Sequence, residues 1–573
     1  MKYVKTRKRF AYKIISSALV ISMLSSYSAG AKFVDLSGYS WAEQAINDMA
    51  DLGILNGVGD NKFSPQGNVT RQEFLAMVLR AFGGEEKISE LAQKMSEKAQ
   101  YEDKSLYTLS EAEKSYGEDN WSNEILVASQ YFDNIEKLWA CDLSQWGEKA
   151  TRAEMAFIMM TVAEGLGNEK FEIKDGINSV IGDFSDVITS QFGYYIMQAY
   201  SNGILVGVDD SGSYKPNNFV TRAETACAMQ RLVDTQKRKN IDVDKTSNII
   251  SVKPNNIDEV TAIFKNIIML EQDKVELDTS NINWKYGYEL DLKNAYYAVL
   301  SDSPSLKYAY DVSFKQDANK ITCTFSYMPY KLNAYKNGIP EGAYEISSLK
   351  DITLLTNNMI DGTTSKKIAI TNPDIDVDDI QRTLLQCGYG FIVYTLNKDA
   401  TEIVATCNTG VDSLSESVLD INESFNLAKS ILEKIINDKM TDMEKIQAIY
   451  KYITTTVKYD WRYYNDIKSM PFISTTALGA LRDNTAICGG YSWAMKTMLD
   501  YCGIENYTVS GKLGNESHAW NYIILNGKGY YCDPTSDRTG GDYWFMLSRD
   551  ELDKKGNHTW NGDFYERLAD LNN

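Results

Sequence analysis

Histidine is the scarcest chemically important residue in this sequence of 573 residues, which contains only two. The eight cysteines are scattered along the chain, without the close pairs that ligate zinc in structural sites. Both observations disfavour a zinc site. We therefore expect neither a metal nor another cofactor.

Positive charge is also in deficit, because the formal net charge is −19, and this argues against nucleic acid as a partner. No stretch after the first 24 residues is apolar enough to span a membrane. The composition is otherwise globular, with 43% hydrophobic and 24% charged residues, and the length predicts three or more domains.

The N-terminus carries the pattern of an export signal. Six basic residues between Lys2 and Lys13 precede the short apolar segment 14–24, and Ala29-Gly30-Ala31 offers small residues for cleavage. The apolar segment is too short for a membrane anchor. We therefore predict a signal peptide over residues 1–31 and a secreted protein.

Three segments then repeat one pattern. The first runs from Phe33 through Gly53-Ile54-Leu55-Asn56-Gly57 to Val69-Thr70-Arg71-Gln72-Glu73, and a close copy spans Phe184 to Val233. A degenerate copy between them keeps Ala150-Thr151-Arg152-Ala153-Glu154 but lacks the Gly-Ile-Leu-x-Gly segment. In each copy, threonine followed three residues later by glutamate predicts a capping box at a helix start. The arginine between them is expected to point away from the core.

Recurrence of this arginine at one structural position favours a binding role over a solvated charge. The set resembles the S-layer homology (SLH) family, in which three repeats form an all-α bundle that holds exported proteins on the cell wall. The resemblance implies a negatively charged, often pyruvylated, secondary cell-wall polysaccharide as partner, bound through arginine. It assigns as polymer-binding residues Asp35, Trp41, Arg71, Arg152, Asp186 and Arg222.

A cysteine near the C-terminus stands where a nucleophile would. Cys488 is followed by Gly489-Gly490 and by helical spacing that stops at Gly503, which predicts a helix from Cys488 to about Cys502. At a helix N-terminus the thiol faces unpaired N–H groups and the positive end of the dipole. Both favour the thiolate that a nucleophile needs.

A predicted hairpin downstream supplies a base and a carboxylate. His518 begins a strand that turns at Asn526-Gly527 and returns to Asp533. If Leu525 pairs with Lys528, His518 becomes the diagonal neighbour of Asp533, within reach of an imidazole and a carboxylate. Together with Cys488 this arrangement follows the Cys-His-Asp logic of acyl transfer.

Residues 441–547 resemble the transglutaminase-like (papain-like cysteine) superfamily. The motifs that carry the resemblance, in matching order and spacing, are Tyr459-Asp460, Cys488-Gly489-Gly490-Tyr491, Val509-Ser510-Gly511, His518-Ala519-Trp520-Asn521 and Tyr531-Cys532-Asp533-Pro534-Thr535. The resemblance implies an α+β domain with Cys488, His518 and Asp533 as catalytic residues. It also implies that Tyr459, Gly489 and Trp520 shape the substrate cleft or oxyanion site. Many relatives carry an acidic residue at the position of Gly489.

The chain is thus expected to be multidomain. The expected parts are the signal peptide (1–31), SLH repeats (32–84, 85–168 and 169–234), a linker (235–256), a middle α/β lobe of unreadable function (257–415) and the transglutaminase-like domain (416–573). The second repeat holds a charged insertion around residues 85–116.

The function expected is that of a cell-surface protein anchored to wall polysaccharide, with a domain that acts on a peptide or protein substrate through a thioester. Either water or an amine accepts the acyl group, and hydrolysis is favoured because cross-linking needs a tunnel that excludes water. The alternative is a catalytically inactive adhesion or scaffold protein with the same fold.

Overall fold

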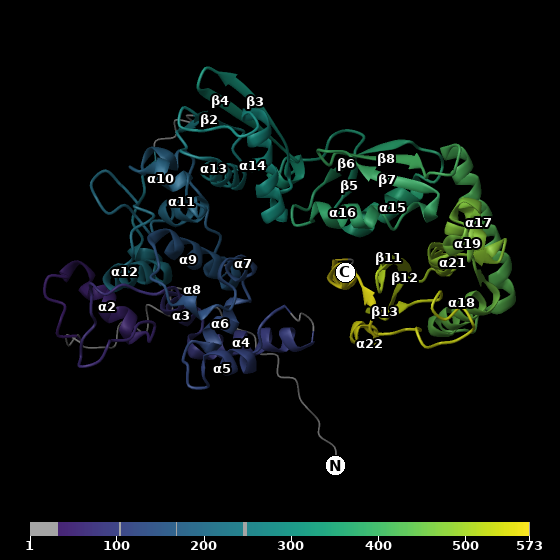
Figure 1. Cartoon of the computed structure of the whole chain (residues 1–573), viewed down its shortest axis with the longest axis horizontal. Coiled ribbons are helices and arrows are strands. Elements are labelled where there is room, and N and C mark those ends of the chain that lie inside the picture. The colour runs from purple at the N-terminus through teal and green to yellow at the C-terminus, as the bar shows by residue number, and fades with distance from the viewer. Residues whose placement is uncertain (1–32, 102–104, 168, 244–248, 572–573) are drawn as a thin grey trace, which may run out of the picture. The chain divides into compact units, whose positions relative to one another are not determined.

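The computed structural model describes residues 33–101, 105–167, 169–243 and 249–571, so the predicted signal peptide and part of the linker lie outside the described residues. The chain divides into two compact units (Figure 1). Unit 1 comprises Met1–Leu306 and Val312–Phe325, and unit 2 comprises Lys307–Asp311 and Ser326–Asn573.

The first part of unit 1 is helical. Its α-helices are α2 (Ser40–Asp51), α3 (Arg71–Ala81), α4 (Gly84–Tyr101), α5 (Leu109–Tyr116), α6 (Asn123–Ser129), α7 (Asp133–Trp139), α8 (Leu143–Trp146), α9 (Arg152–Leu166), α10 (Phe184–Ile188), α11 (Gly193–Ser201) and α12 (Arg222–Val233). The helices α3, α9 and α12 begin at the three repeated arginines. All three carry the predicted capping box between threonine and glutamate.

The backbone just before these three helices closes into a ring. The N–H of Val69 donates to Val220 O at 3.3 Å, that of Val220 to Ala150 O at 3.1 Å, and that of Ala150 to Val69 O at 2.9 Å. Isolated β-bridges flank these bonds between Asn68 and Thr221, Thr70 and Lys149, and Thr151 and Phe219. The degenerate second copy therefore occupies the same position in the ring as the other two.

The expected outward direction of the three arginines is wrong. Arg152 and Arg222 are only 5% and 8% exposed. Each arginine lies over an aromatic ring of the next copy: Arg71 over Trp139 at 5.1 Å, Arg152 over Tyr214 at 4.7 Å and Arg222 over Phe63 at 4.6 Å. The first helical position directs the side chain sideways into the neighbouring copy, where stacking and carbonyl acceptors hold the guanidinium.

The arginines also donate to one equivalent carbonyl in each copy. Arg222 donates to Asn56 O, and Arg152 donates to Val206 O at 2.9 Å, so both reach the fourth residue of a Gly-Ile-Leu-x-Gly segment. Arg71 donates to Gln145 O at 2.7 Å. Gln145, in α8, therefore takes the place of that segment in the second copy, where the sequence shows no such motif.

Two small α/β modules follow, with the same order of elements, β-α-β-α-β-β. The first consists of β1 (Ile250–Val252), α13 (Ile257–Met269), β2 (Lys274–Asp278), α14 (Tyr288–Asp302), β3 (Ala309–Asp317) and β4 (Lys320–Tyr327). The second consists of β5 (Tyr344–Ile346), α15 (Leu349–Asn358), β6 (Ser365–Ile370), α16 (Val377–Leu384), β7 (Ile392–Leu396) and β8 (Glu402–Cys407). The single lobe expected over residues 257–415 is thus divided into two modules.

The two modules also share their sheet topology. The strand orders are β1-β2-β4-β3 and β5-β6-β8-β7. In both sheets the first two strands are parallel, and the second strand pairs antiparallel with the fourth. The boundary between the units runs through β3 and β4, so unit 2 contains the second module and the C-terminal domain.

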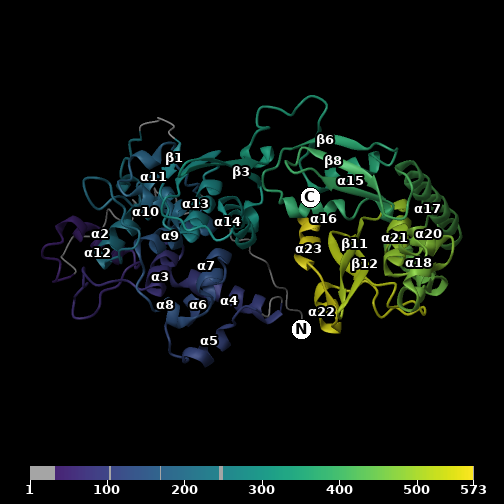
Figure 2. The same ribbon diagram turned by 45° about the horizontal axis from the view of Figure 1, so that its top comes forward.

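The C-terminal domain places a group of helices against an antiparallel sheet. The helices are α17 (Leu414–Ile435), α18 (Asp442–Thr456), α19 (Arg462–Asn465), α20 (Ala477–Leu481), α21 (Cys488–Tyr501), α22 (Arg549–Lys555) and α23 (Gly562–Leu571). The sheet has the order β13-β12-β11-β14, built from β11 (Asn506–Leu513), β12 (Glu516–Leu525), β13 (Lys528–Cys532) and β14 (His558–Thr559). Figure 2 shows α17, α18 and α20 gathered around α21, which contacts β11 and β12.

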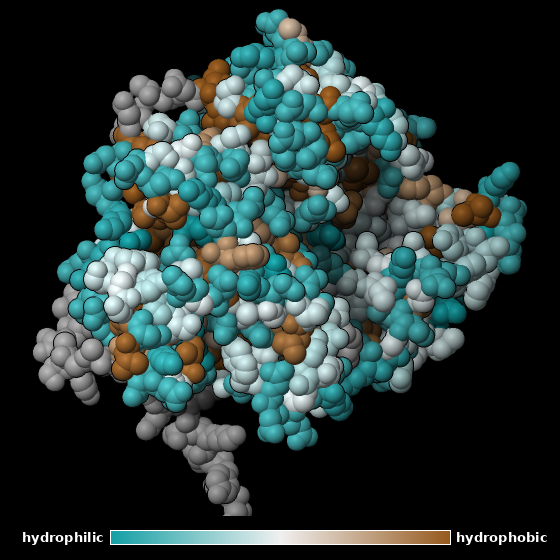
Figure 3. All heavy atoms as spheres, turned by 60° about the vertical axis from the view of Figure 1, so that its left-hand side comes forward, coloured by the Kyte–Doolittle hydropathy of each residue, from teal (hydrophilic) through white to brown (hydrophobic). Residues whose placement is uncertain are grey.

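The molecular surface around α2 and α12 carries both hydrophilic and hydrophobic residues. Figure 3 shows it as mainly hydrophilic, with small hydrophobic groups separated from one another. Within the part of the chain that the structure describes, no helix is both long and apolar enough to cross a bilayer.

Candidate active site

Cys488 is the first residue of α21, as predicted, and glycine makes this helix start possible. A Cβ atom on Gly490 would lie 2.7 Å from both Ala486 Cβ and Ser474 O, so only glycine fits there. The helix ends at Tyr501, and Gly503 follows with φ of 70°, the left-handed position that was expected of it. The thiol therefore sits beside the unpaired N–H groups of the first helical turn.

The predicted hairpin register is confirmed, since Leu525 pairs with Lys528. It brings His518 Nε2 to 2.8 Å from Asp533 Oδ2, with both side chains nearly buried at 8% and 1% exposure. Burial alone would lower the pKa of His518. Hydrogen bonds to Asp533 and to Cys488 outweigh burial and raise that pKa to about 10, so the imidazole lies between the carboxylate and the thiol.

Asp533 receives hydrogen bonds on both carboxylate oxygens. Oδ1 accepts from the backbone N–H groups of Thr535 at 3.0 Å and Ser536 at 3.1 Å. Oδ2 accepts from the Ser536 hydroxyl at 2.5 Å in addition to His518. Burial acts to raise the pKa of Asp533, but the hydrogen bonds, first from His518 and then from His558, hold it well below its usual range.

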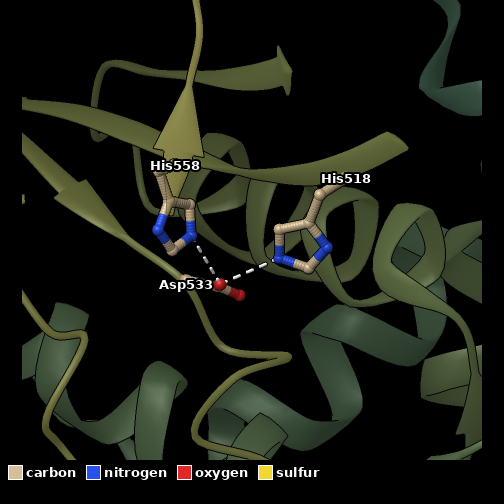
Figure 4. A group of neighbouring side chains, drawn as sticks. All are labelled: His518, Asp533 and His558. Carbon is tan, nitrogen blue, oxygen red and sulfur yellow. Dashed lines mark hydrogen bonds and ion pairs between the residues drawn. The ribbon is translucent and has the colours of Figure 1, made fainter. Parts of the chain in front are cut away.

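The second histidine belongs to this site, and the sequence did not reveal it. His558 Nε2 lies 3.1 Å from Asp533 Oδ2, and its side chain is fully buried (Figure 4). Its ring packs against Trp520 and Trp544, at centroid distances of 4.9 and 4.8 Å. His558 reaches the site only because the short strand β14 pairs with β11, a contact for which local sequence gives no signal.

His518, Asp533 and His558 are also the one group of candidate metal ligands among the described residues, with their ligand atoms within 4.8 Å of one another. Both imidazoles, however, direct Nε2 at the same carboxylate oxygen at hydrogen-bond distance (Figure 4). A zinc ion would need a common point at about 2 Å from each nitrogen. The geometry therefore fits a hydrogen-bonded network better than a metal centre.

A cavity of about 290 Å³ opens at Cys488 and His518. Its other lining residues are Tyr459, Trp461, Tyr463, Tyr464, Leu513, Glu516, Ser517, Thr535, Ser536 and Arg538. Tyr459 lines it as expected, because the strand β9 (Lys458–Tyr459) pairs with β10 (Thr485–Ala486) just before Cys488.

Two residues assigned to the cleft are not part of its lining. Trp520 is fully buried and stacks on His518 at 5.8 Å between ring centroids. It therefore packs against the histidine and exposes no surface that could contact substrate. Gly489 faces the Thr475 carbonyl, which a Cβ atom would approach to 3.1 Å. A side chain at this position would require the Thr475 carbonyl to shift slightly.

The residues assigned to polymer binding lie in different settings. Trp41 is 58% exposed and is available to a ligand. Asp35 accepts from the N–H groups of Phe63 at 2.8 Å and Ser64 at 2.7 Å, and so closes a turn. In the last repeat the matching bonds go to Asp183, which leaves Asp186 exposed on α10.

Comparison with known families finds a match in the helical N-terminal part of the chain and another in the C-terminal domain. The S-layer homology domain matches residues 32–75 and 183–226, and the transglutaminase-like superfamily matches residues 429–534. The family match does not extend to the second repeat. The chain thus carries two SLH segments, which suggest anchoring to the cell wall, and a transglutaminase-like domain, which suggests acyl transfer or proteolysis.

No curated protein matches the chain. A solved structure titled "Crystal structure of a TGase" is 13% identical, with 47% of this chain and 52% of that chain covered and a TM-score of 0.19. The chain therefore spans about half the length of that protein. A likeness at this TM-score carries no argument about function.

Proposed function

We propose that this protein is a wall-anchored cysteine enzyme that transfers acyl groups from peptide or protein amides. Cys488 is the nucleophile, His518 the proton carrier and Asp533 the residue that orients the imidazole. The observation that carries the proposal is the 2.8 Å bond between His518 and Asp533, made beside Cys488 in an open cavity.

In the proposed first step, the Cys488 sulfur forms a bond to the carbonyl carbon of the donor amide. His518 gives its proton to the leaving nitrogen, the C–N bond breaks, and a thioester remains. Backbone N–H groups in the first turn of α21 lie where they can stabilise the developing oxyanion. An acceptor then attacks the thioester, His518 takes its proton, and the thiolate returns.

Hydrolysis is the favoured outcome of the second step. Water reaches an open cavity, whereas transfer to an amine needs walls that exclude water. Trp493, Trp520 and Trp544 lie near the catalytic residues in the sequence and are candidates for such walls, but they are not among the residues that line the cavity. Trp461 and Tyr464 line the cavity and are 54% and 52% exposed, so this part of its wall is open to solvent.

The test is to incubate the purified full chain with a glutamine-rich protein, with and without a fluorescent primary amine. Conversion of glutamine to glutamate and peptide cleavage report hydrolysis, covalent fluorescence reports cross-linking, and ammonia release reports formation of the thioester whichever acceptor follows. The proposal expects hydrolysis that is lost in Cys488→Ala and kept in Cys502→Ala, a matched control at another partly exposed cysteine. Amine incorporation without hydrolysis would reverse the acceptor preference. Equal rates in wild type and Cys488→Ala would favour the inactive scaffold.

We further propose that residues 32–234 form three SLH repeats that bind a secondary cell-wall polysaccharide, probed here as purified cell walls. The backbone hydrogen bonds that join Val69, Ala150 and Val220 support the degenerate second copy as a full member of the set of three. Because Arg152 and Arg222 are nearly buried and donate to backbone carbonyls, they are proposed to shape the grooves. Arg71 is also held, by Glu154 and the Gln145 carbonyl, but its side chain is 16% exposed, so it is proposed to meet the polymer together with exposed Trp41.

A pull-down of the full chain with cell walls tests this second proposal. Trp41→Ala and Arg71→Ala are each expected to weaken retention several-fold, since charge-assisted and stacking contacts contribute about 1–3 kcal/mol. Tyr297→Ala is the matched control, because Tyr297 is 60% exposed against 58% for Trp41 and lies outside the three repeats, in α14. Unchanged retention in a Trp41→Ala/Arg71→Ala double variant would contradict the assignment.

A further inference from the structure

One arginine in the cavity beside Cys488 has no assigned role. Arg538 lines the same cavity as Cys488 and His518. Its guanidinium lies over two aromatic rings, 5.5 Å from the centroid of Tyr459 and 5.5 Å from that of Trp461. Contact with both rings limits the directions in which the N–H groups of the guanidinium can point.

The hydrogen-bonding capacity of Arg538 is largely unused. Within the described part of the chain, one of the five N–H donors of this guanidinium is engaged, from Nη1 to Thr535 O at 3.0 Å. Among the described residues no carboxylate forms an ion pair with it. Its neighbour Arg462 contrasts with it, because both oxygens of Asp460 hold Arg462 at 2.8 Å and 2.8 Å.

The remaining charges at the cavity define where an anion would fit. Glu516 lies at the rim and accepts a hydrogen bond from the Tyr464 hydroxyl at 2.6 Å. An anion is therefore repelled at the Glu516 side and attracted at the Arg538 side. The chain as a whole carries a net charge of −19, so an acidic substrate gains attraction only from such a local cation.

We propose that Arg538 selects acyl donors that carry a carboxylate next to the amide attacked by Cys488. The guanidinium can present two parallel N–H groups to that carboxylate, the geometry in which arginine binds carboxylates most strongly. The substrate class is thus an acidic peptide, and the carboxylate is that of an acidic side chain or of a peptide C-terminus. This proposal rests on the proposed acyl-transfer function.

The test uses peptide vinyl sulfones, which alkylate the nucleophile of the cleft, on the full chain. One pair of probes differs only by Glu or Gln beside the electrophile, and a second pair only by a C-terminal carboxylate or carboxamide. Rates of Cys488 modification are compared by mass spectrometry in wild type, Arg538→Glu and Arg538→Lys. Arg482→Glu is the control with the same charge change outside the cavity lining. Iodoacetamide, which is too small to engage Arg538, measures the intrinsic reactivity of Cys488 in every variant.

One acidic probe is expected to react about tenfold faster than its neutral partner in wild type, as for one charge-assisted contact. Which pair shows the preference identifies the source of the carboxylate. The preference should reverse in Arg538→Glu, shrink in Arg538→Lys and persist in Arg482→Glu, with unchanged iodoacetamide rates. Equal rates for both pairs in wild type, with Cys488 still alkylated by iodoacetamide, would overturn the Arg538 proposal alone. A Cys488 that iodoacetamide does not modify would overturn the proposed function and this inference with it.

Discussion

Unit 1 and unit 2 each contain a buried network of charged side chains: the repeated arginines that surround the backbone ring in unit 1, and the site around Asp533 in unit 2. Only the arginine network has all its partners within the protein. In the ring, Arg152 donates to Tyr214 O, Val206 O and Glu224, all within the protein. Around Asp533, the chain of contacts runs through His518 to a thiol that faces a cavity. A closed network stabilises a fold, whereas a network that ends at a cavity can act on a ligand. Substitutions should therefore affect stability in the ring and activity at the cleft.

The largest effect is expected for His518→Ala, which removes the proton carrier at the open end of the network. Activity should fall by roughly a thousandfold or more, because members of a nucleophile–base pair fail together. The midpoint of thermal unfolding should fall only moderately, because Asp533, although nearly buried, loses His518 but keeps its hydrogen bonds from Ser536. Steady-state rates and a melting curve on the same preparation check both expectations. Comparable losses of stability and activity would place His518 in a structural role.

Arg152→Ala is the matching substitution in the ring, and it should lower stability while leaving activity at the cleft unchanged. We expect the free energy of unfolding of unit 1 to fall by about 3 kcal/mol. This is near the low end for breaking a buried ion pair, because Glu224 is partly exposed. Calorimetry of the full chain measures this change. The control is Arg80→Ala, whose partner Glu85 is 69% exposed, so the loss there should stay below about 1 kcal/mol. Equal losses in the two variants would contradict a closed ring.

A smaller effect is expected for His558→Gln, which weakens the second imidazole contact to Asp533. His558 is a positioning residue, and kcat should fall about tenfold while KM stays unchanged. Burial lowers the pKa of His518, but the hydrogen bonds to Asp533 and Cys488 together raise it to about 10, and the protonated imidazole is lost as pH rises through that value. A loosened Asp533 should therefore move the alkaline limb of the pH–rate profile to lower pH. A drop in kcat without this shift would leave His558 a packing residue.

The parts of the site that follow from local pattern were predictable from the sequence. The helical spacing that stops at Gly503 located α21, and the Asn526-Gly527 turn fixed a register that brings His518 to Asp533. Contacts between distant segments were not predictable. His558 depends on the pairing of β14 with β11, and the inward direction of Arg152 depends on an aromatic ring in the next repeat.

The duplicated α/β module was also invisible in the sequence. The two copies share the order of their elements and strands, but no motif repeats between them. Topology of this kind is specified by where apolar residues fall, and many different residues satisfy the same pattern. Trp520 was misplaced for a related reason, since an aromatic residue beside a cleft and one beneath it look alike in sequence.

The most direct measurement of the central claim, that Cys488 is an activated nucleophile, is the alkylation rate of each of the eight cysteines. All eight are free, and Cys407 and Cys502 share the partly exposed character of Cys488, so they control for access. With limiting iodoacetamide at mildly acidic pH, peptide mass spectrometry should find Cys488 modified well ahead of both, and the lead should vanish in His518→Ala. Equal or faster modification of Cys407 or Cys502, or a lead that survives His518→Ala, would contradict the account.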